Sequence, residues 1–128
     1  MRTFLKLLTF LLFFGASCKD NANQEIFCTD EYKMVSVRVE FESMPPLVFD
    51  YFTVNLLSGD TIRYNENLPL ENTYVVLADN YQSELENKLE EFAFIGIHED
   101  TLLFNETYVI GADECHIYKE EGKSVIEL

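Results

Sequence analysis

The chain has 128 residues and a formal charge of −14 at pH 7, with 23 acidic side chains against nine basic ones. Nucleic-acid binders need clustered Lys and Arg to displace counterions from phosphates, so this charge excludes a nucleic-acid partner. It also argues against adhesion to anionic lipid headgroups by charge. The acidic side chains serve either solubility or, alternatively, the binding of a cation or a basic partner.

The first 17 residues have the pattern of a secretory signal. Arg2 and Lys6 form a positive head, residues 7–14 are apolar apart from Thr9, and residues 15–17 are the small Gly, Ala and Ser. The apolar run is shorter than the about 20 residues that cross a bilayer. We therefore expect residues 1–17 to be a signal peptide that is removed.

Cys18 follows the small residues directly, and this arrangement resembles the lipobox of bacterial lipoproteins. The resemblance implies that the Cys18 thiol receives a diacylglyceryl group, that the chain is cut before Cys18, and that a fatty acid such as palmitate acylates the new amino terminus. Several acyl chains anchor a protein stably, whereas one does not. We expect a lipid-anchored protein of the bacterial envelope, with a soluble secreted protein as the alternative.

Cleavage before Cys18 leaves 111 residues, one domain's worth, with seven basic and 23 acidic side chains and a formal charge of −16. We expect residues 18–31 to be the lipid anchor and tether, and residues 32–128 to fold. Lys19-Asp20 resembles the charged run that sends Bacteroidota lipoproteins to the cell surface. Whether the protein faces the periplasm or the cell surface stays open.

Two further cysteines, Cys28 and Cys115, form an even pair once Cys18 carries lipid. In an oxidising compartment such a pair is expected to be joined. We predict a disulfide bond that ties the approach to the first strand to the penultimate strand. Two buried free thiols are the alternative, and the absence of a CxxC spacing argues against a redox role.

Apolar and polar residues alternate with a period of two in several segments, which predicts strands. The clearest segment is residues 32–42, and the next is residues 49–57, where Phe52, Val54 and Leu56 mark one apolar face. Further strands are expected at residues 61–64, 73–78, 92–98, 101–104, 106–110, 115–119 and 124–128, with the last two joined as a hairpin and a possible break at Asn105. Residues 84–92 have helical spacing and predict one short helix.

Seven or eight short strands with almost no helix predict an all-β fold, a single antiparallel β-sandwich. Residues 35–57, an alternating strand, a proline-containing break and a second alternating strand, resemble the prealbumin-like sandwiches, including the regulatory-domain-like modules of secreted carboxypeptidases. The ending Gly-Ala-Asp-Glu-Cys-His-Ile at residues 111–117 resembles small lipoproteins of the Bacteroidota. Neither resemblance supplies catalytic residues, and no cofactor is expected.

The best candidates for chemistry are His98, His116 and Asp113. If the two histidines lie on neighbouring strands, their imidazoles and a carboxylate could bind a divalent transition metal. The simpler interpretation is that His116 is a half-exposed strand residue beside a disulfide and that His98 ends a strand. Thr61 and Thr101 each follow an aspartate and precede an aliphatic residue, which resembles the O-glycosylation sites of exported Bacteroidota proteins.

The leading hypothesis is a non-enzymatic binding or structural accessory module, held to the membrane by its N-terminal lipid, with an unknown protein or glycan partner. One alternative is a metal-dependent or glycan-active envelope enzyme built around His98 and His116. Another is an assembly component that pairs through an exposed edge strand near Pro69. Five tyrosines could form a platform that binds sugars or peptides, with ordinary packing in the sandwich as the alternative: Tyr51, Tyr64, Tyr74, Tyr81 and Tyr118.

Overall fold

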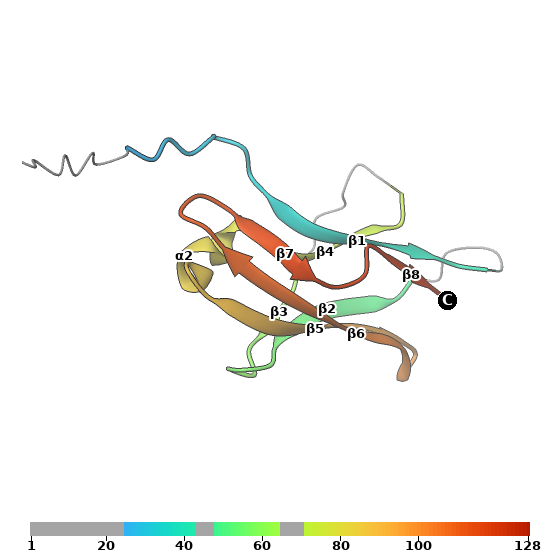
Figure 1. Cartoon of the computed structure of the whole chain (residues 1–128). Helices are drawn as coiled ribbons and strands as arrows, with labels where there is room; N and C mark the ends of the chain where they lie inside the picture. Colours follow the sequence, from blue (N-terminus) through green and yellow to red (C-terminus); the bar gives the residue numbers. More distant parts are fainter. Residues whose placement is uncertain (1–24, 43–47, 65–70) are drawn as a thin grey trace, which may run out of the picture.

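A computed structural model describes residues 25–42, 48–64 and 71–128. Two sheets lie face to face, a three-stranded sheet of order β4-β1-β8 and a five-stranded sheet of order β3-β2-β5-β6-β7 (Figure 1). The strands are β1 (Met34–Glu40), β2 (Asp50–Asn55), β3 (Thr61–Ile62), β4 (Thr73–Ala78), β5 (Leu89–His98), β6 (Thr101–Ala112), β7 (Ile117–Glu121) and β8 (Val125–Glu127). The predicted all-β sandwich is confirmed.

Strand β1 forms as its alternation predicts. Val35, Val37 and Val39 are buried between the two sheets, while Arg38 and Glu40 are exposed. This period of two is what one buried face and one solvated face require. β1 is the central strand of its sheet, pairing antiparallel with β4 and parallel with β8. One pairing in this sheet is therefore parallel, where the sequence led us to expect antiparallel strands throughout.

Strand β2 turns its more polar face inward, which corrects the interpretation of residues 49–57. Thr53 and Asn55 are buried, whereas Leu56 is exposed and Phe52 only partly covered. The Thr53 hydroxyl donates to the carbonyl of Val76 in the opposite sheet at 2.6 Å. That bond satisfies a buried hydroxyl and a buried carbonyl together, so this side chain can face the core.

The C-terminal strands do not form the predicted hairpin. β7 pairs with β6 in the five-stranded sheet, and β8 crosses to the other sheet and pairs with β1. The crossing passes Gly122, which has a φ of 129° and lies against the ring of Tyr108; an added Cβ would be 2.3 Å from that ring. Glycine meets both demands, because it has no Cβ and tolerates positive φ. The last strand therefore connects the two layers.

The helical stretch is shorter and earlier than predicted. The short 3₁₀ helix η1 (Asp79–Tyr81) is followed by α2 (Gln82–Leu85), a single turn. Asn87, with a φ of 58°, ends the helical region, and β5 begins at Leu89. Residues 89–92, assigned to the helix from their spacing, therefore belong to a strand. β6 also runs unbroken through Asn105, which pairs with Ile95.

Aromatic side chains fill much of the space between the sheets. Phe94 and Tyr108 are fully buried, and the Phe94 ring lies 5.3 Å from that of Phe104. Tyr51 and Tyr74 pack edge to face against each other at 4.9 Å and join this core. These contacts follow the preferred geometries of aromatic pairs. Tyr51 and Tyr74 are therefore packing residues and do not form an exposed platform.

Candidate functional site

Cys28 and Cys115 form a disulfide bond, with their Cα atoms 5.3 Å apart. The predicted pairing is confirmed. Cys28 lies in the extended segment before β1, and Cys115 lies in the turn between β6 and β7. The bond closes a loop across 87 positions of sequence. It thereby fastens the N-terminal segment to the end of the sandwich that carries α2 (Figure 1).

A second, non-covalent connection lies beside the disulfide and is centred on Asp79. One carboxylate oxygen, Oδ2, accepts from the backbone N–H of Lys33 and contacts Nδ1 of His116, each at 2.7 Å. The other, Oδ1, accepts from the N–H of Ile117 at 2.9 Å. Nε2 of His116 lies 3.0 Å from the Thr29 hydroxyl. The end of β4, the N-terminal segment and the start of β7 are thus joined at one side chain.

The ionised form of Asp79 is favoured here. Partial burial works against the charge, but hydrogen bonds from the N–H groups of Lys33 and Ile117 and the contact with His116 outweigh it, so the pKa of Asp79 is lowered from its ordinary value. Sequence reasoning did not identify Asp79. Its partners His116 and Lys33 lie 37 and 46 positions away in the sequence, so no local sequence pattern identifies them.

Asp113 shapes the turn that holds Cys115. Its Oδ1 accepts from the N–H groups of Cys115 and His116 at 2.7 and 2.8 Å, a local turn motif typical of aspartate. The hydrogen bonds from the N–H groups of His116 and Cys115 are the main causes that lower the pKa of Asp113 from its ordinary value. Its carboxylate therefore organises the backbone around the disulfide.

The two histidines lie at opposite ends of the five-stranded sheet. His98 pairs with Thr101 at one end of β5, whereas His116 directly precedes Ile117, which pairs with Ala112 at the other end. Ten residues of β5, at about 3.3 Å each, put roughly 30 Å between these ends. His98, His116 and Asp113 cannot share one ion, and the hypothesis of a metal site built on both histidines is wrong. Within the described residues, no three His, Cys, Asp or Glu side chains are grouped as a metal site.

The remaining candidate residues are Thr61, Thr101, Cys18 and Pro69. Thr61 in β3 and Thr101 at the start of β6 are exposed, as a modifying enzyme would require, and their glycosylation stays a prediction. Cys18 and Pro69 lie outside the described residues.

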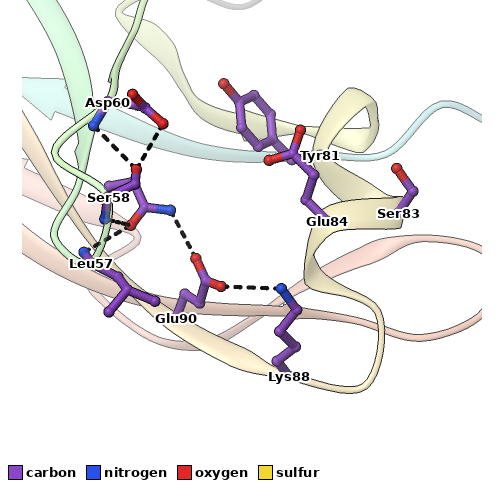
Figure 2. A pocket seen from close by; sticks show the side chains of 9 residues that line it. Leu57, Ser58, Asp60, Tyr81, Ser83, Glu84, Lys88 and Glu90 are labelled. Atoms are coloured by element: carbon purple, nitrogen blue, oxygen red, sulfur yellow. Dashed lines mark hydrogen bonds and ion pairs between the residues drawn. The ribbon is translucent and has the colours of Figure 1, made fainter.

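A polar hollow lies between the turn after β2 and the helical segment (Figure 2). It is lined by Asn55, Leu57, Ser58, Asp60, Tyr81, Ser83, Glu84, Lys88 and Glu90. Asn55 builds its floor: Oδ1 accepts from the N–H groups of Leu57 and Ser58, and Nδ2 donates to Glu90 at 2.8 Å. The buried Asn55 thus shapes the turn and fixes a carboxylate at once.

The hollow is electronegative. Glu90 is held by Asn55 and, at 3.4 Å, by the ammonium group of Lys88, and Asp60 accepts from the Ser58 hydroxyl at 2.8 Å. The pKa of Tyr81 is raised, by partial burial first and then by the charges of Glu84 and Asp60. A cationic group would be favoured in this field.

The hollow presents polar and negatively charged groups whose hydrogen bonds are largely made within the protein. The Ser58 hydroxyl donates to a carboxylate, and both oxygens of Glu90 already have partners. A serine nucleophile needs an adjacent base that accepts its proton and is itself oriented, usually a histidine. Neither His98 nor His116 lines this hollow. Its geometry offers hydrogen bonding and negative charge to a ligand.

Comparisons of the chain with protein-family models, curated proteins and solved structures find no match. The resemblances drawn from residues 35–57 and 111–117 therefore stay predictions. In the part of the chain that the structure describes, no helix combines the length and apolar character needed to cross a membrane.

Proposed function

We propose that the chain is a lipid-anchored protein of the bacterial envelope that acts as a non-enzymatic binding or structural accessory module. In this proposal Cys18 carries the lipid, residues 18–31 are the tether, and the β-sandwich is the working part. The observation that carries it is the Cys28–Cys115 disulfide. Structural disulfides persist in oxidising compartments such as the periplasm and the cell surface, where the signal pattern would send this chain.

The position of the disulfide also suits a tethered protein. Ten positions separate Cys18 from Cys28, a reach of at most about 36 Å when the chain is extended. A pull on the lipid would arrive at Cys28 and pass through the covalent bond into the β6–β7 turn. β1, which follows Cys28, would not be drawn out of its sheet by that force.

A binding role is favoured over catalysis by the polar hollow. Two of its carboxylates are held in place, Glu90 by Asn55 and Lys88 and Asp60 by Ser58, and such an arrangement presents charge to a partner. The glycan-active alternative has no such support, because His98 and His116 lie at opposite ends of the sheet.

Replacement of Cys18 tests the anchor. In cells given an alkyne analogue of palmitate, we expect the wild-type chain to be labelled and to partition into the detergent phase of a Triton X-114 extract. Cys18→Ser is expected to lose the palmitate label. The matched control is the double variant Cys28→Ser/Cys115→Ser, which removes the other two thiols and should keep label and partitioning. Label that survives Cys18→Ser would refute the anchor.

A further inference from the structure

Four exposed apolar side chains gather at the α2 end of the five-stranded sheet. Leu56, Leu57, Leu89 and Tyr118, here called the leucine patch, are 50, 81, 52 and 42% exposed. Leu56 and Leu57 directly follow β2, Leu89 begins β5, and Tyr118 lies in β7. Exposed leucines collected in one place, unlike single ones, are typical of an interaction surface.

The members of the leucine patch are neighbours in space. The N–H of Leu56 donates to the carbonyl of Glu91 at 3.0 Å, which places the end of β2 beside the start of β5. Leu89 and Tyr118 both lie over Gly111: a Cβ added there would be 2.7 Å from Cδ2 of Leu89 and 3.0 Å from Cζ of Tyr118. The missing side chain of Gly111 thus lets these two side chains meet.

The surface around the patch is concave. One hollow is lined by Leu56, Leu57, Leu89, Glu90 and Glu91. A second is lined by Asn87, Lys88, Leu89, Ala112, Asp113, Glu114 and Tyr118. Leu89 is common to both, and Leu57 and Glu90 are shared with the polar hollow of Figure 2. The three hollows are therefore neighbours, and each is lined by at least one leucine of the patch.

The rim of this surface is acidic. Glu91 borders the first hollow, Asp113 and Glu114 border the second, and Asp60 and Glu84 border the polar one. Among the described residues that line these hollows, the one basic side chain is Lys88, which borders two of the three and is paired with Glu90 at 3.4 Å. Complementary charge around an apolar centre directs which partner docks and in which orientation.

We propose that the leucine patch binds a protein segment in which apolar side chains are flanked by Lys or Arg. The apolar side chains would cover the leucines, and the basic groups would meet the acidic rim. A second copy of this chain is disfavoured, since each copy carries a formal charge of −14 before processing. An anionic membrane surface is repelled for the same reason. The inference deepens the proposed binding role by naming the chemistry of the partner.

A peptide-binding measurement tests this inference. The probes are a synthetic heptapeptide of alternating Lys and Leu and its counterpart of alternating Glu and Leu. The protein is expressed from Met1 with its own leader and measured as the cell delivers it, in phosphatidylcholine nanodiscs if lipidated and in buffer if not. A missing lipid would thus end the anchor proposal while leaving the binding test intact.

Substitutions in the patch should weaken binding selectively. Leu57→Ser and Leu89→Ser are expected to raise the Kd for the Lys–Leu peptide at least about fivefold, as loss of a central apolar contact does. The matched control is Leu102→Ser, at a leucine that is 59% exposed near the opposite end of the sheet, with a change of less than about twofold. Glu91→Lys should weaken binding, whereas Glu40→Lys in β1 should not.

Three results would overturn the inference. The first is equal weakening by Leu57→Ser and Leu102→Ser, in variants whose circular dichroism matches that of the wild type. The second is equal binding of the Glu–Leu peptide, which would show that charge has no part. The third is a different occupant of the patch. Either a dimer that is seen in sedimentation and dissociates in Leu57→Ser, or flotation with phosphatidylglycerol vesicles that requires Leu57, would show it.

Discussion

Asp79 has a structural importance that its position in the sequence does not suggest. Its two oxygens bind the N–H groups of Lys33 and Ile117 and the imidazole of His116, and so connect three segments of the chain. A hydrogen bond to a charged acceptor is worth about 1.5–3 kcal/mol, more than one between neutral groups. The Asp79 contacts lie beside the disulfide, and together with it they hold the N-terminal segment to the sandwich.

Asp79→Asn should lower the free energy of unfolding by about 1–3 kcal/mol at neutral pH, because an amide loses the charge and one acceptor oxygen. The pKa of Asp79 is lower in the folded protein than in the unfolded chain. Its ionised form therefore stabilises the fold above the ordinary aspartate pKa of about 3.9, and this contribution is lost as pH falls through the folded value.

Urea unfolding at pH 7 and at pH 3 measures this difference. The difference in the free energy of unfolding between wild type and Asp79→Asn should be about 1–3 kcal/mol at pH 7 and should be smaller at pH 3. Asp30→Asn, at an exposed aspartate in the N-terminal segment, is the matched control and should show no gap at either pH. A gap of unchanged size at both pH values would mean that the Asp79 charge contributes nothing.

At the scale of strands, local alternation located most of the elements. β1 and β2 lie within two residues of their predicted positions, because alternation with a period of two indicates a strand with one buried face. β4 was predicted from its β-branched and aromatic residues and has the predicted bounds, and β5 begins three residues earlier than predicted. The same pattern could not say which face of β2 is inside. That depended on Val76, a hydrogen-bond partner of Thr53 that is 23 positions away.

The local sequence pattern also could not predict which strands pair with one another. β7 and β8 are close in sequence and separated by a turn signal, which is how a hairpin looks. In the structure β8 instead pairs with β1, at Arg38–Glu40, where the three-stranded sheet would otherwise end at β1. The cysteine pairing could be predicted because only two thiols remained after Cys18, so no spatial information was needed.

The disulfide should contribute substantially to stability. Cys28→Ser/Cys115→Ser is expected to lower the free energy of unfolding by up to about 4–5 kcal/mol, the chain-entropy figure for a loop that spans 87 positions. Urea titration with and without a reductant measures it. Reductant should lower the midpoint of the wild type to that of the double variant and leave the variant unchanged. Equal midpoints for oxidised wild type and variant would contradict this role.

The whole molecule has two different ends. The N-terminal segment lies at the α2 end (Figure 1), where the disulfide joins it to the β6–β7 turn. The polar hollow is lined in part by residues of η1 and α2, and Leu89 of the leucine patch begins the strand that follows α2. The C-terminus and the β5–β6 turn lie at the other end. In the proposed arrangement a partner of the leucine patch would be met on the side from which the tether leaves. Attachment and recognition would then share one end of the sandwich.

The most direct test of this account is the intact mass of the protein extracted from its native membranes, after alkylation of free thiols without reduction. We predict a chain that begins at Cys18, carries a diacylglyceryl group and an N-terminal acyl chain, and has no alkylated cysteine. A chain with an unmodified Cys18, or with alkyl groups on Cys28 and Cys115, would contradict the account.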